Sequence, residues 1–216
     1  MIGHNVKQGS SEWLRARAGI VTASELHNLV TPKGKVRTGE GVDTYVYRKI
    51  AETWLTNQVE SHRSFAMEQG SILEETARPW LALELGCPID EAAFVTTDDR
   101  LCGASPDGMV RGSNIGVEIK CPEPTNHVRW VVEGVVPPEH LLQCLGGMYV
   151  TGADEWVFCS YRRLFPNLVV RVPRDPMMME VIRVAVEAAT ERIKAGVALL
   201  HAAYATAMVP DETHDF

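Results

Sequence analysis

The stretch 105–122 contains the residues best suited to catalysis, namely Asp107, Glu118 and Lys120. Glu118 and Lys120 stand two positions apart in a segment with strand-like composition, and alternate side chains of a strand share one face. The turn-forming residues at 111–114 would fold Asp107 back beside Glu118. We therefore expect two carboxylates and one ammonium group to converge at one end of a sheet.

These groups predict metal-assisted phosphate chemistry. Two carboxylates can bind Mg²⁺, which takes its other ligands from water and substrate phosphate, and the backbone carbonyl of Ile119 could supply one more. A bound metal lowers the pKa of its water and offsets charge on the phosphorus. Lys120 could orient that water or accept its proton. The competing interpretation is a solvent-exposed salt bridge between Glu118 and Lys120. The preceding Ser-Pro-Asp-Gly segment favours the catalytic interpretation.

The remaining sequence alternates between helical and strand-like patterns, which predicts an α/β core with helices on both faces of a sheet. Within the strand-like segment 115–120, Val117 and Ile119 should point into the core. Strands are expected at 92–97, 101–105, 115–120, 155–162 and 167–172. Helices are expected at 11–19, 22–30, 41–58, 65–86, 125–136 and 138–150, and residues 177–208 should form one long helix or a pair of helices. Pro79 should kink or divide the fourth of these helices, because it lacks a backbone N–H.

Length and composition exclude several classes of protein. The 216 residues suit a single domain, 1–216, with a flexible acidic tail at about 210–216. No run of about 18 apolar residues and no apolar N-terminal stretch is present, which argues against a membrane span and against export, and therefore for the cytoplasm. The five cysteines form no Cys-x-x-Cys pair, which argues against zinc and iron–sulfur sites. Trp13, Trp54 and Trp80 are assigned to packing.

The formal net charge of −7 argues against a protein that coats nucleic acid through bulk positive charge. The charge is nevertheless uneven. Residues 7–37 hold six basic and two acidic residues, a net of +4, whereas residues 38–107 hold five basic and thirteen acidic residues, a net of −8. A local nucleic-acid site near the N-terminus is therefore compatible with the composition.

Pro106-Asp107, ten intervening residues and Glu118-Ile119-Lys120 resemble the PD-(D/E)XK nuclease superfamily. Further segments resemble one branch of it, the lambda exonuclease-like (YqaJ-type viral recombinase) nucleases. In family order these segments are 13–24, 70–78, 103–108, 117–122 and 140–143 followed by 148–150. The resemblance covers roughly residues 11–165 and implies a restriction-endonuclease-like fold, a mixed central sheet flanked by helices.

The resemblance also implies roles around the metal. Asp107 and Glu118 would bind the metal with the carbonyl of Ile119, and Lys120 would serve the attacking water. Glu74 matches the acidic residue that the family places on a helix near the metal. Glu75 is the competing candidate, because neighbours on a helix point about 100° apart and only one can face inward. The motif position favours Glu74.

Three segments outside the metal motif match family positions that contact DNA or border the active site. Gln143 matches a helix glutamine at the edge of the active site. Arg17 matches an arginine that receives the DNA 5′-phosphate, as its planar guanidinium suits phosphate. Thr22 and Ser24, at a predicted helix start, could add donors to the same anion, and so could Ser105.

The function implied is a Mg²⁺-dependent exonuclease that digests linear double-stranded DNA 5′→3′ to mononucleotides and leaves 3′ single-stranded tails for phage-type recombination. The resemblance further implies a two-ion site in which Mn²⁺ could replace Mg²⁺, a homotrimeric ring around DNA, and a single-strand-annealing recombinase as partner. It also implies a phage or prophage gene expressed in a bacterial cell.

Two alternatives are an endonuclease of the same superfamily and a non-catalytic DNA-binding module. A fixed 5′-phosphate pocket at Arg17 would argue against the first, because it makes a strand end part of the substrate. The complete set of Asp107, Glu118 and Lys120 argues against the second, because a binding module has no need of clustered acids facing phosphate.

Overall fold

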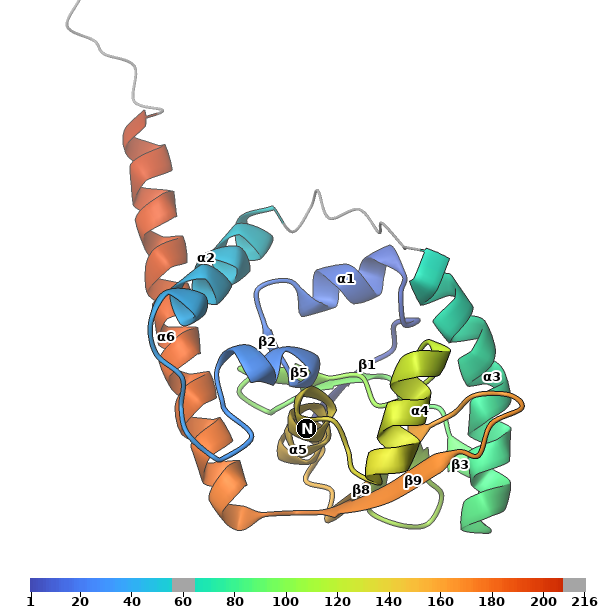
Figure 1. The fold of residues 1–216 in the computed structure, drawn as a ribbon. Coiled ribbons are helices and arrows are strands. Elements are labelled where there is room, and N and C mark those ends of the chain that lie inside the picture. The colour runs from blue at the N-terminus through green and yellow to red at the C-terminus, as the bar shows by residue number, and fades with distance from the viewer. Residues whose placement is uncertain (56–64, 208–216) are drawn as a thin grey trace, which may run out of the picture.

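Two β-sheets and the surrounding helices make up the fold of the described residues, 1–55 and 65–207, in this computed structural model (Figure 1). The smaller sheet has the strand order β1-β4-β5-β2, formed by β1 (Ile2–His4), β4 (Phe94–Thr96), β5 (Cys102–Ala104) and β2 (Val21–Thr22). The larger sheet has the order β3-β6-β7-β8-β9, formed by β3 (Ile89–Asp90), β6 (Gly108–Val110), β7 (Ile115–Lys120), β8 (Glu155–Ser160) and β9 (Leu168–Pro173). Both sheets mix parallel and antiparallel pairs.

Six α-helices and one 3₁₀-helix are present in the described ranges. They are α1 (Ser11–Arg17), η1 (Ala23–Asn28), α2 (Glu40–Trp54), α3 (Phe65–Leu85), α4 (Pro124–Glu133), α5 (Pro138–Thr151) and α6 (Pro176–Ala207). None of these helices is long and apolar enough to cross a bilayer. The predicted α/β class with a mixed, helix-flanked sheet is confirmed, and the five-stranded sheet is the central one.

The structure corrects two predicted helices. α3 continues through Pro79 as one helix and is not divided there. The predicted helix 22–30 is the shorter 3₁₀-helix η1, and the Thr22 side chain does not cap it. Thr22 instead donates its hydroxyl to Glu25 Oε2 at 2.9 Å, because both side chains take part in a polar cluster described below. The acidic tail expected at 210–216 lies outside the described residues, and the single domain stays a prediction.

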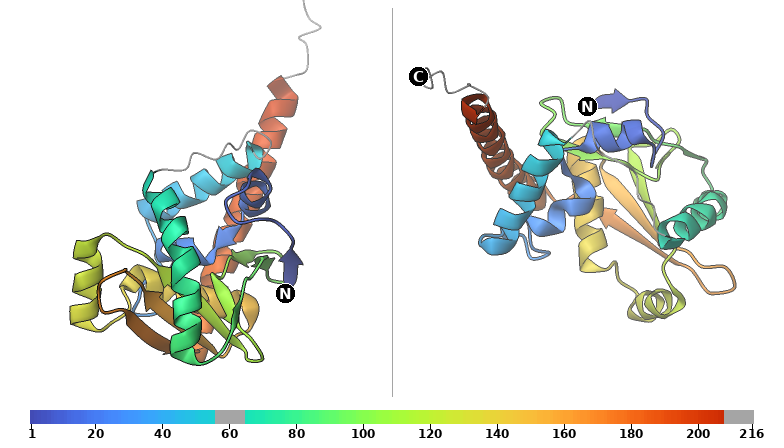
Figure 2. Two further views of the ribbon diagram at one scale, coloured as in Figure 1. Left: turned by 90° about the vertical axis from the view of Figure 1, so that its right-hand side faces the viewer. Right: turned by 90° about the horizontal axis from the view of Figure 1, so that it is seen from above.

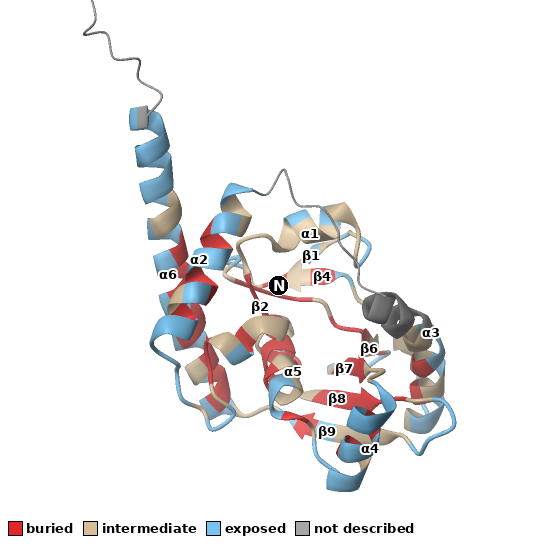
Figure 3. Ribbon diagram, turned by 45° about the horizontal axis from the view of Figure 1, so that its top comes forward, coloured by how far each residue is buried: buried red, intermediate tan, exposed pale blue. Residues whose placement is uncertain are grey.

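The two faces of the central sheet are buried against different helices, as Figure 2 and Figure 3 show. Trp156 and Phe158 of β8 belong to the core that contains α5, whereas Val117 and Ile119 of β7 belong to the core that contains α3. Because strand side chains alternate, Glu118 and Lys120 share the α5 face. The predicted division of β7 into an apolar and a polar face is thereby confirmed.

α5 contacts both η1 and the central sheet through two adjacent glycines. A Cβ atom on Gly146 would lie 2.9 Å from Ala23 Cα of η1, and one on Gly147 would lie 2.4 Å from the Trp156 ring of β8. Real Cβ atoms do not approach that closely, so the pair permits α5 to fit between these two elements. This packing places α5 between the N-terminal segments and β7.

We expect Gly147→Ala to lower the free energy of unfolding by about 1–2 kcal/mol. Overpacking against the Trp156 ring costs about 1–3 kcal/mol, whereas the better helix propensity of alanine returns up to about 1 kcal/mol. Urea denaturation measures the difference. Gly41→Ala in α2 is the matched control, because a Cβ there meets nothing within 4 Å. If Gly147→Ala proves as stable as Gly41→Ala, this account of α5 packing is wrong.

Candidate active site

Asp107 lies beside β7 because β6 and β7 form an antiparallel hairpin. Gly108 is paired with Val117, and the Asp107 N–H donates to the Val117 carbonyl at 3.1 Å. The N–H of Ile119 in turn donates to Asp107 Oδ2 at 2.6 Å. The turn at 111–114 therefore folds Asp107 back onto β7, as the sequence predicted.

Glu118, which is buried, and Lys120, which is half-buried, form an ion pair on the face of β7 that α5 covers. Glu118 is 2 % exposed, and Lys120 Nζ contacts its Oε1. Within the described residues this oxygen makes the ion-pair contact but accepts no well-oriented hydrogen bond. Asp107, Glu118 and Lys120 thus come together, and the solvent-exposed salt bridge considered as the alternative is excluded by burial.

α3 directs Glu74, rather than Glu75, toward the carboxylate cluster. Glu74 is half-buried and lies 3.5 Å from Arg78 Nη2, whereas Glu75 is exposed. Arg78 Nε also donates to the Asp107 carbonyl at 3.0 Å, which connects this part of α3 to the backbone of Asp107. The arrangement agrees with the preference for Glu74. Sequence reasoning missed Arg78, although its position one helical turn after Glu74 was a usable indication.

The three acids perturb one another. Desolvation raises the pKa of Glu118 to about 8 against the opposing effect of Lys120, and the nearby Asp107 raises it further. Desolvation and Asp107 raise the pKa of Glu74 to about 7. Burial also raises the pKa of Asp107, opposed by Lys120 and the Ile119 N–H. Although desolvation lowers the pKa of Lys120, Glu118 and Asp107 hold it above its ordinary value. Ionising all three carboxyl groups without a bound cation is therefore unfavourable, because the negative charges are desolvated and close together.

The donor set fits a hard divalent cation. Asp107, Glu118 and Glu74 supply carboxylate oxygens, and the carbonyl of Ile119 follows Glu118 on the same strand, which is the ligand chemistry that Mg²⁺ prefers. Glu118 Oε1 is buried and accepts no well-oriented hydrogen bond in the described residues, so this oxygen is available to bind a cation. No group of three His, Cys, Asp or Glu in the described ranges is already arranged as a metal cage. Lys120 Nζ contacts Glu118 Oε1.

The raised pKa values predict a pH dependence of stability in the metal-free protein. A carboxyl whose pKa is higher in the folded than in the unfolded state contributes stability at low pH, and this is lost as pH rises through the folded pKa. For Glu118 the loss falls between about pH 4.5 and 8. We expect the melting temperature in EDTA to decrease over this range, and Glu118→Gln to decrease less. Thermal melts at pH 5 and pH 8 measure both. Equal pH dependence of the two proteins would contradict the assignment.

Arg17 is surrounded by hydroxyl groups. Its guanidinium donates to Ser24 Oγ at 3.3 Å, and to Thr22 Oγ1 and Ser105 Oγ at 3.4 Å each. Within the described residues no carboxylate lies within ion-pair distance of it. Burial lowers the pKa of Arg17, whereas Glu25 and Glu52 oppose that change. A largely desolvated guanidinium with only hydroxyl partners is suited to receive an anion.

Trp13 positions both Arg17 and Ser105. The guanidinium of Arg17 lies 4.2 Å from the centre of the Trp13 ring system, and Trp13 Nε1 donates to Ser105 Oγ at 2.9 Å. The assignment of Trp13 to packing alone was therefore incomplete. The spacing of Trp13 and Arg17, four residues apart on one helix, could have revealed the contact.

The four residues predicted to bind phosphate are brought together, but not equivalently. Ser24 and Ser105 line a cavity with Arg17, whereas Thr22 is fully buried behind it. The Thr22 hydroxyl donates a hydrogen bond to Glu25, and Glu25 also contacts the buried Lys49 Nζ at 2.6 Å. Thr22 is thus placed to hold the Arg17 side chain and is not placed to donate to an anion.

One cavity joins the Arg17 group to the carboxylate cluster. It is lined by Arg17, Ser24, Ser105, Glu118 and Gln143, among others. A second, more open cleft is lined by Glu74 and Asp107. Pro106 lies at the edge of both hollows, so the motif residues connect the two.

Gln143 enters the cavity from α5, at the position that its helix was expected to give it. His140 lies one turn earlier on α5, and the centre of its ring lies 5.2 Å from that of Trp130 and 5.8 Å from that of Phe158. Desolvation, reinforced by the charge of Lys120, lowers the pKa of His140 to about 4. A neutral imidazole, that of His140, therefore lies one turn from Gln143 on α5.

Comparison with known proteins agrees with this geometry. Two solved structures of LHK-Exo, an alkaline exonuclease from Laribacter hongkongensis, one of them in complex with dAMP, superpose with a TM-score of 0.80. Each is 28 % identical in sequence, and the match covers 91 % of this chain and 99 % of that chain. A phage-related exonuclease from Haemophilus somnus 129PT shares the fold, with a TM-score of 0.67 and 15 % identity, over 84 % of this chain and 96 % of that one. No curated protein matches the sequence.

The sequence also matches a model of the YqaJ-like viral recombinase domain over residues 12–154, well over half of the chain. The matched range includes Arg17, Glu74, Asp107, Glu118 and Gln143, which the fold brings around connected hollows. The resemblance seen in the separate sequence motifs is therefore confirmed. The chain belongs to the YqaJ-like viral recombinase domain family.

Proposed function

We propose that this protein is a Mg²⁺-dependent exonuclease that digests linear double-stranded DNA from its 5′ ends. The observation that carries this proposal is the single cavity shared by Arg17, Ser24 and Ser105 at one side and Glu118 and Gln143 at the other. An anion-binding group next to catalytic carboxylates selects a substrate whose terminal phosphate lies close to the bond to be cleaved.

The phosphate ligands are supplied by donors that the structure orients. Ser105 Oγ accepts from Trp13 Nε1 and Arg17 Nη1, so its own O–H is available to donate to phosphate. Arg17 supplies charge, and Ser24 supplies a second hydroxyl. Because the terminal phosphate would be bound in the same cavity as Glu118, the product is a mononucleotide. The dAMP complex of LHK-Exo supports a nucleoside monophosphate as the product of such a site.

Two metal ions would be held at this site, and Mn²⁺ could replace Mg²⁺. Their ligands would be Asp107, Glu118, Glu74 and the Ile119 carbonyl. When bound, the metal supplies a more acidic water and stabilises charge on the phosphoryl group. Lys120, which contacts Glu118, would orient the attacking water through its ammonium group. Gln143 donates its amide N–H groups to substrate oxygens at the border of the cavity.

The biological role follows from polarity. An enzyme that recognises a 5′-phosphate digests 5′→3′ and leaves a 3′ single-stranded tail. Membership of a viral recombinase family supports a phage or prophage role in DNA recombination, in which a single-strand-annealing protein would bind that tail. A homotrimeric ring around the duplex, which the resemblance of the sequence motifs implies, would retain the DNA between turnovers.

Digestion of three duplexes tests the proposal. With Mg²⁺ we expect release of mononucleotides from the 5′-labelled end of a linear 5′-phosphorylated duplex, slower release from a dephosphorylated one, and no cutting of a covalently closed circle. Efficient cutting of the circle would show an endonuclease instead. Binding of DNA without cleavage of any of the three would identify a non-catalytic module.

A further inference from the structure

The turn between β8 and β9, residues 161–167, presents two exposed side chains whose placement core packing does not explain. Leu164 is 95 % exposed and has a φ of 72°, a left-handed conformation that residues with side chains rarely adopt. Arg163 beside it is exposed too, and has no ion-pair or hydrogen-bond partner for its side chain in the described part of the chain. A leucine side chain that is exposed and has a strained backbone does not stabilise the fold of the chain. Such a residue is better explained by contact with a binding partner.

The turn is tied by hydrogen bonds to the residues that follow the catalytic strand. The N–H of Tyr161 donates to the Lys120 carbonyl at 2.8 Å, and Arg162 Nη1 donates to the Pro122 carbonyl at 2.7 Å. The N–H of Arg162 also donates to Asn167 Oδ1 at 2.8 Å, which closes the turn. The two side chains at the tip are therefore held at a fixed position relative to Lys120.

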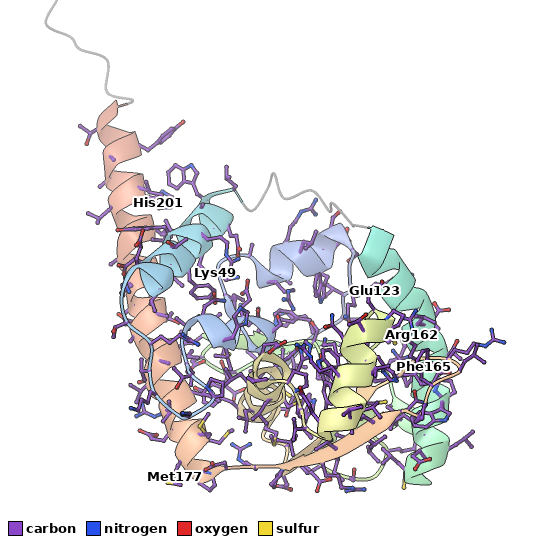
Figure 4. The ribbon with its side chains drawn as sticks, viewed as in Figure 1. Lys49, Glu123, Arg162, Phe165, Met177 and His201 are labelled. Carbon is purple, nitrogen blue, oxygen red and sulfur yellow. The ribbon has the colours of Figure 1, made fainter. Side chains whose placement is uncertain are left out.

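Ring contacts fix the same turn to the helices on either side, and Figure 4 shows Arg162 and Phe165 between α4 and α3. The Tyr161 ring lies 5.6 Å from Trp80 of α3, and the Phe165 ring lies edge-on to His127 of α4 at 5.7 Å. His127 Nε2 donates to the Pro166 carbonyl at 2.9 Å. The turn thus bridges the helix that carries Glu74 and the strand that carries Lys120.

The position of the turn relates it to the DNA path. Trp80, its contact on α3, stands six residues after Glu74, which is about 9 Å along a helix axis. One strand of a duplex rises about 3.4 Å per nucleotide. A duplex that leaves the carboxylate cluster along the axis of α3 would reach this turn about three nucleotides from the cleaved bond.

We propose that Arg163 binds a backbone phosphate about three nucleotides from the cleaved bond, and that Leu164 packs against the neighbouring sugar or base. This inference rests on the proposed nuclease function and adds a second DNA contact, separate from the Arg17 cavity. The guanidinium supplies the charge, and the anchored turn lowers the entropy lost on binding. The left-handed conformation of Leu164 keeps an apolar group in solvent where the duplex meets the protein.

Fluorescence anisotropy with a labelled duplex in EDTA, where cleavage cannot occur, measures the contribution of Arg163. We expect Arg163→Ala to weaken binding about tenfold and to reduce the slope of log Kd against log salt by about 1. Arg100→Ala is the matched control, because Arg100 is, like Arg163, an exposed arginine in a turn, but it precedes β5, at the other end from Ser105. Its affinity and salt slope should equal those of the wild type.

Neutral methylphosphonate substitutions place the contact on the DNA. In the wild type, a neutral group about three nucleotides from the cleaved bond should weaken binding, whereas in Arg163→Ala the same substitution should have no further effect. An equal loss in both proteins would overturn the assignment of Arg163 to that phosphate.

Leu164→Gly separates binding from folding. Glycine adopts this φ without strain, so the variant should melt at the same or a higher temperature than the wild type. Its affinity for the duplex should nevertheless decrease severalfold. If the wild type digests and binds duplex DNA while Arg163→Ala and Leu164→Gly bind with unchanged affinity and salt slope, this inference is wrong and the proposed function stands. If the wild type neither binds nor digests the duplex, both are wrong.

Discussion

Asp107→Asn is expected to digest linear duplex DNA at least about 1,000-fold more slowly than the wild type while remaining folded. The asparagine side chain keeps an oxygen that can accept the buried hydrogen bond from the Ile119 N–H. It lacks the negative charge needed to bind a divalent cation. Loss of about 4 kcal/mol of transition-state stabilisation corresponds to this factor. Single-turnover digestion with saturating Mg²⁺ measures it, and a thermal melt checks the fold.

The neighbouring acids provide the controls for this prediction. Glu118→Gln should have an effect of similar size, because Glu118 is the other buried carboxylate of the strand motif. On α3, Glu74→Gln should reduce the rate, whereas Glu75→Gln should not, because Glu75 is exposed. Wild-type rates in Asp107→Asn would remove the catalytic model, and equal effects at Glu74 and Glu75 would contradict the orientation of α3.

Arg17→Ala is expected to abolish the preference for 5′-phosphorylated ends. A charged hydrogen-bonding contact with phosphate contributes about 1.5–3 kcal/mol, so digestion of the phosphorylated duplex should become about 10- to 100-fold less efficient. Digestion of the dephosphorylated duplex should change little, because that end never used the contact. The ratio of kcat/KM for the two substrates is therefore the informative quantity.

Two further variants test whether geometry or charge at Arg17 is responsible. Arg15→Ala removes an exposed arginine from the same helix and should leave the ratio unchanged. Arg17→Lys keeps the charge but loses the planar donors that contact Ser24 and Ser105, so it should recover only part of the preference. A full preference for phosphorylated ends in Arg17→Ala would show that the phosphate binds elsewhere.

The strand that carries Glu118 and Lys120 could be predicted from the amino-acid sequence, because the pattern that defines it spans only a few neighbouring residues. Alternation over 115–120 assigns Val117 and Ile119 to one face and Glu118 and Lys120 to the other, and the observed strand has these bounds. A turn of four residues then leaves little choice in where Asp107 lies. α5 was also predicted within one residue, since its apolar spacing continues over four turns.

The cavity around Arg17 is different, because it depends on contacts between segments that lie far apart in the sequence. β2 has two residues, too few to show periodicity, yet its parallel pairing with β5 brings Thr22 beside Gly103 and places Arg17 against Ser105. Likewise, the choice between Glu74 and Glu75 depends on which side of α3 packs on β7. The local sequence does not determine which side of a helix faces a given strand, because that orientation depends on how the elements pack together.

The sequence was sufficient for the acid and lysine motif, the fold class and the family, since each rests on patterns spanning a few residues or on the order of motifs. Tertiary packing was required to separate Ser24 from the buried Thr22, to give Trp13 its contacts with Arg17 and Ser105, and to place the 161–167 turn beside Lys120. Periodicity states which face of an element is apolar, whereas the partner of that face is determined by how the whole chain excludes water.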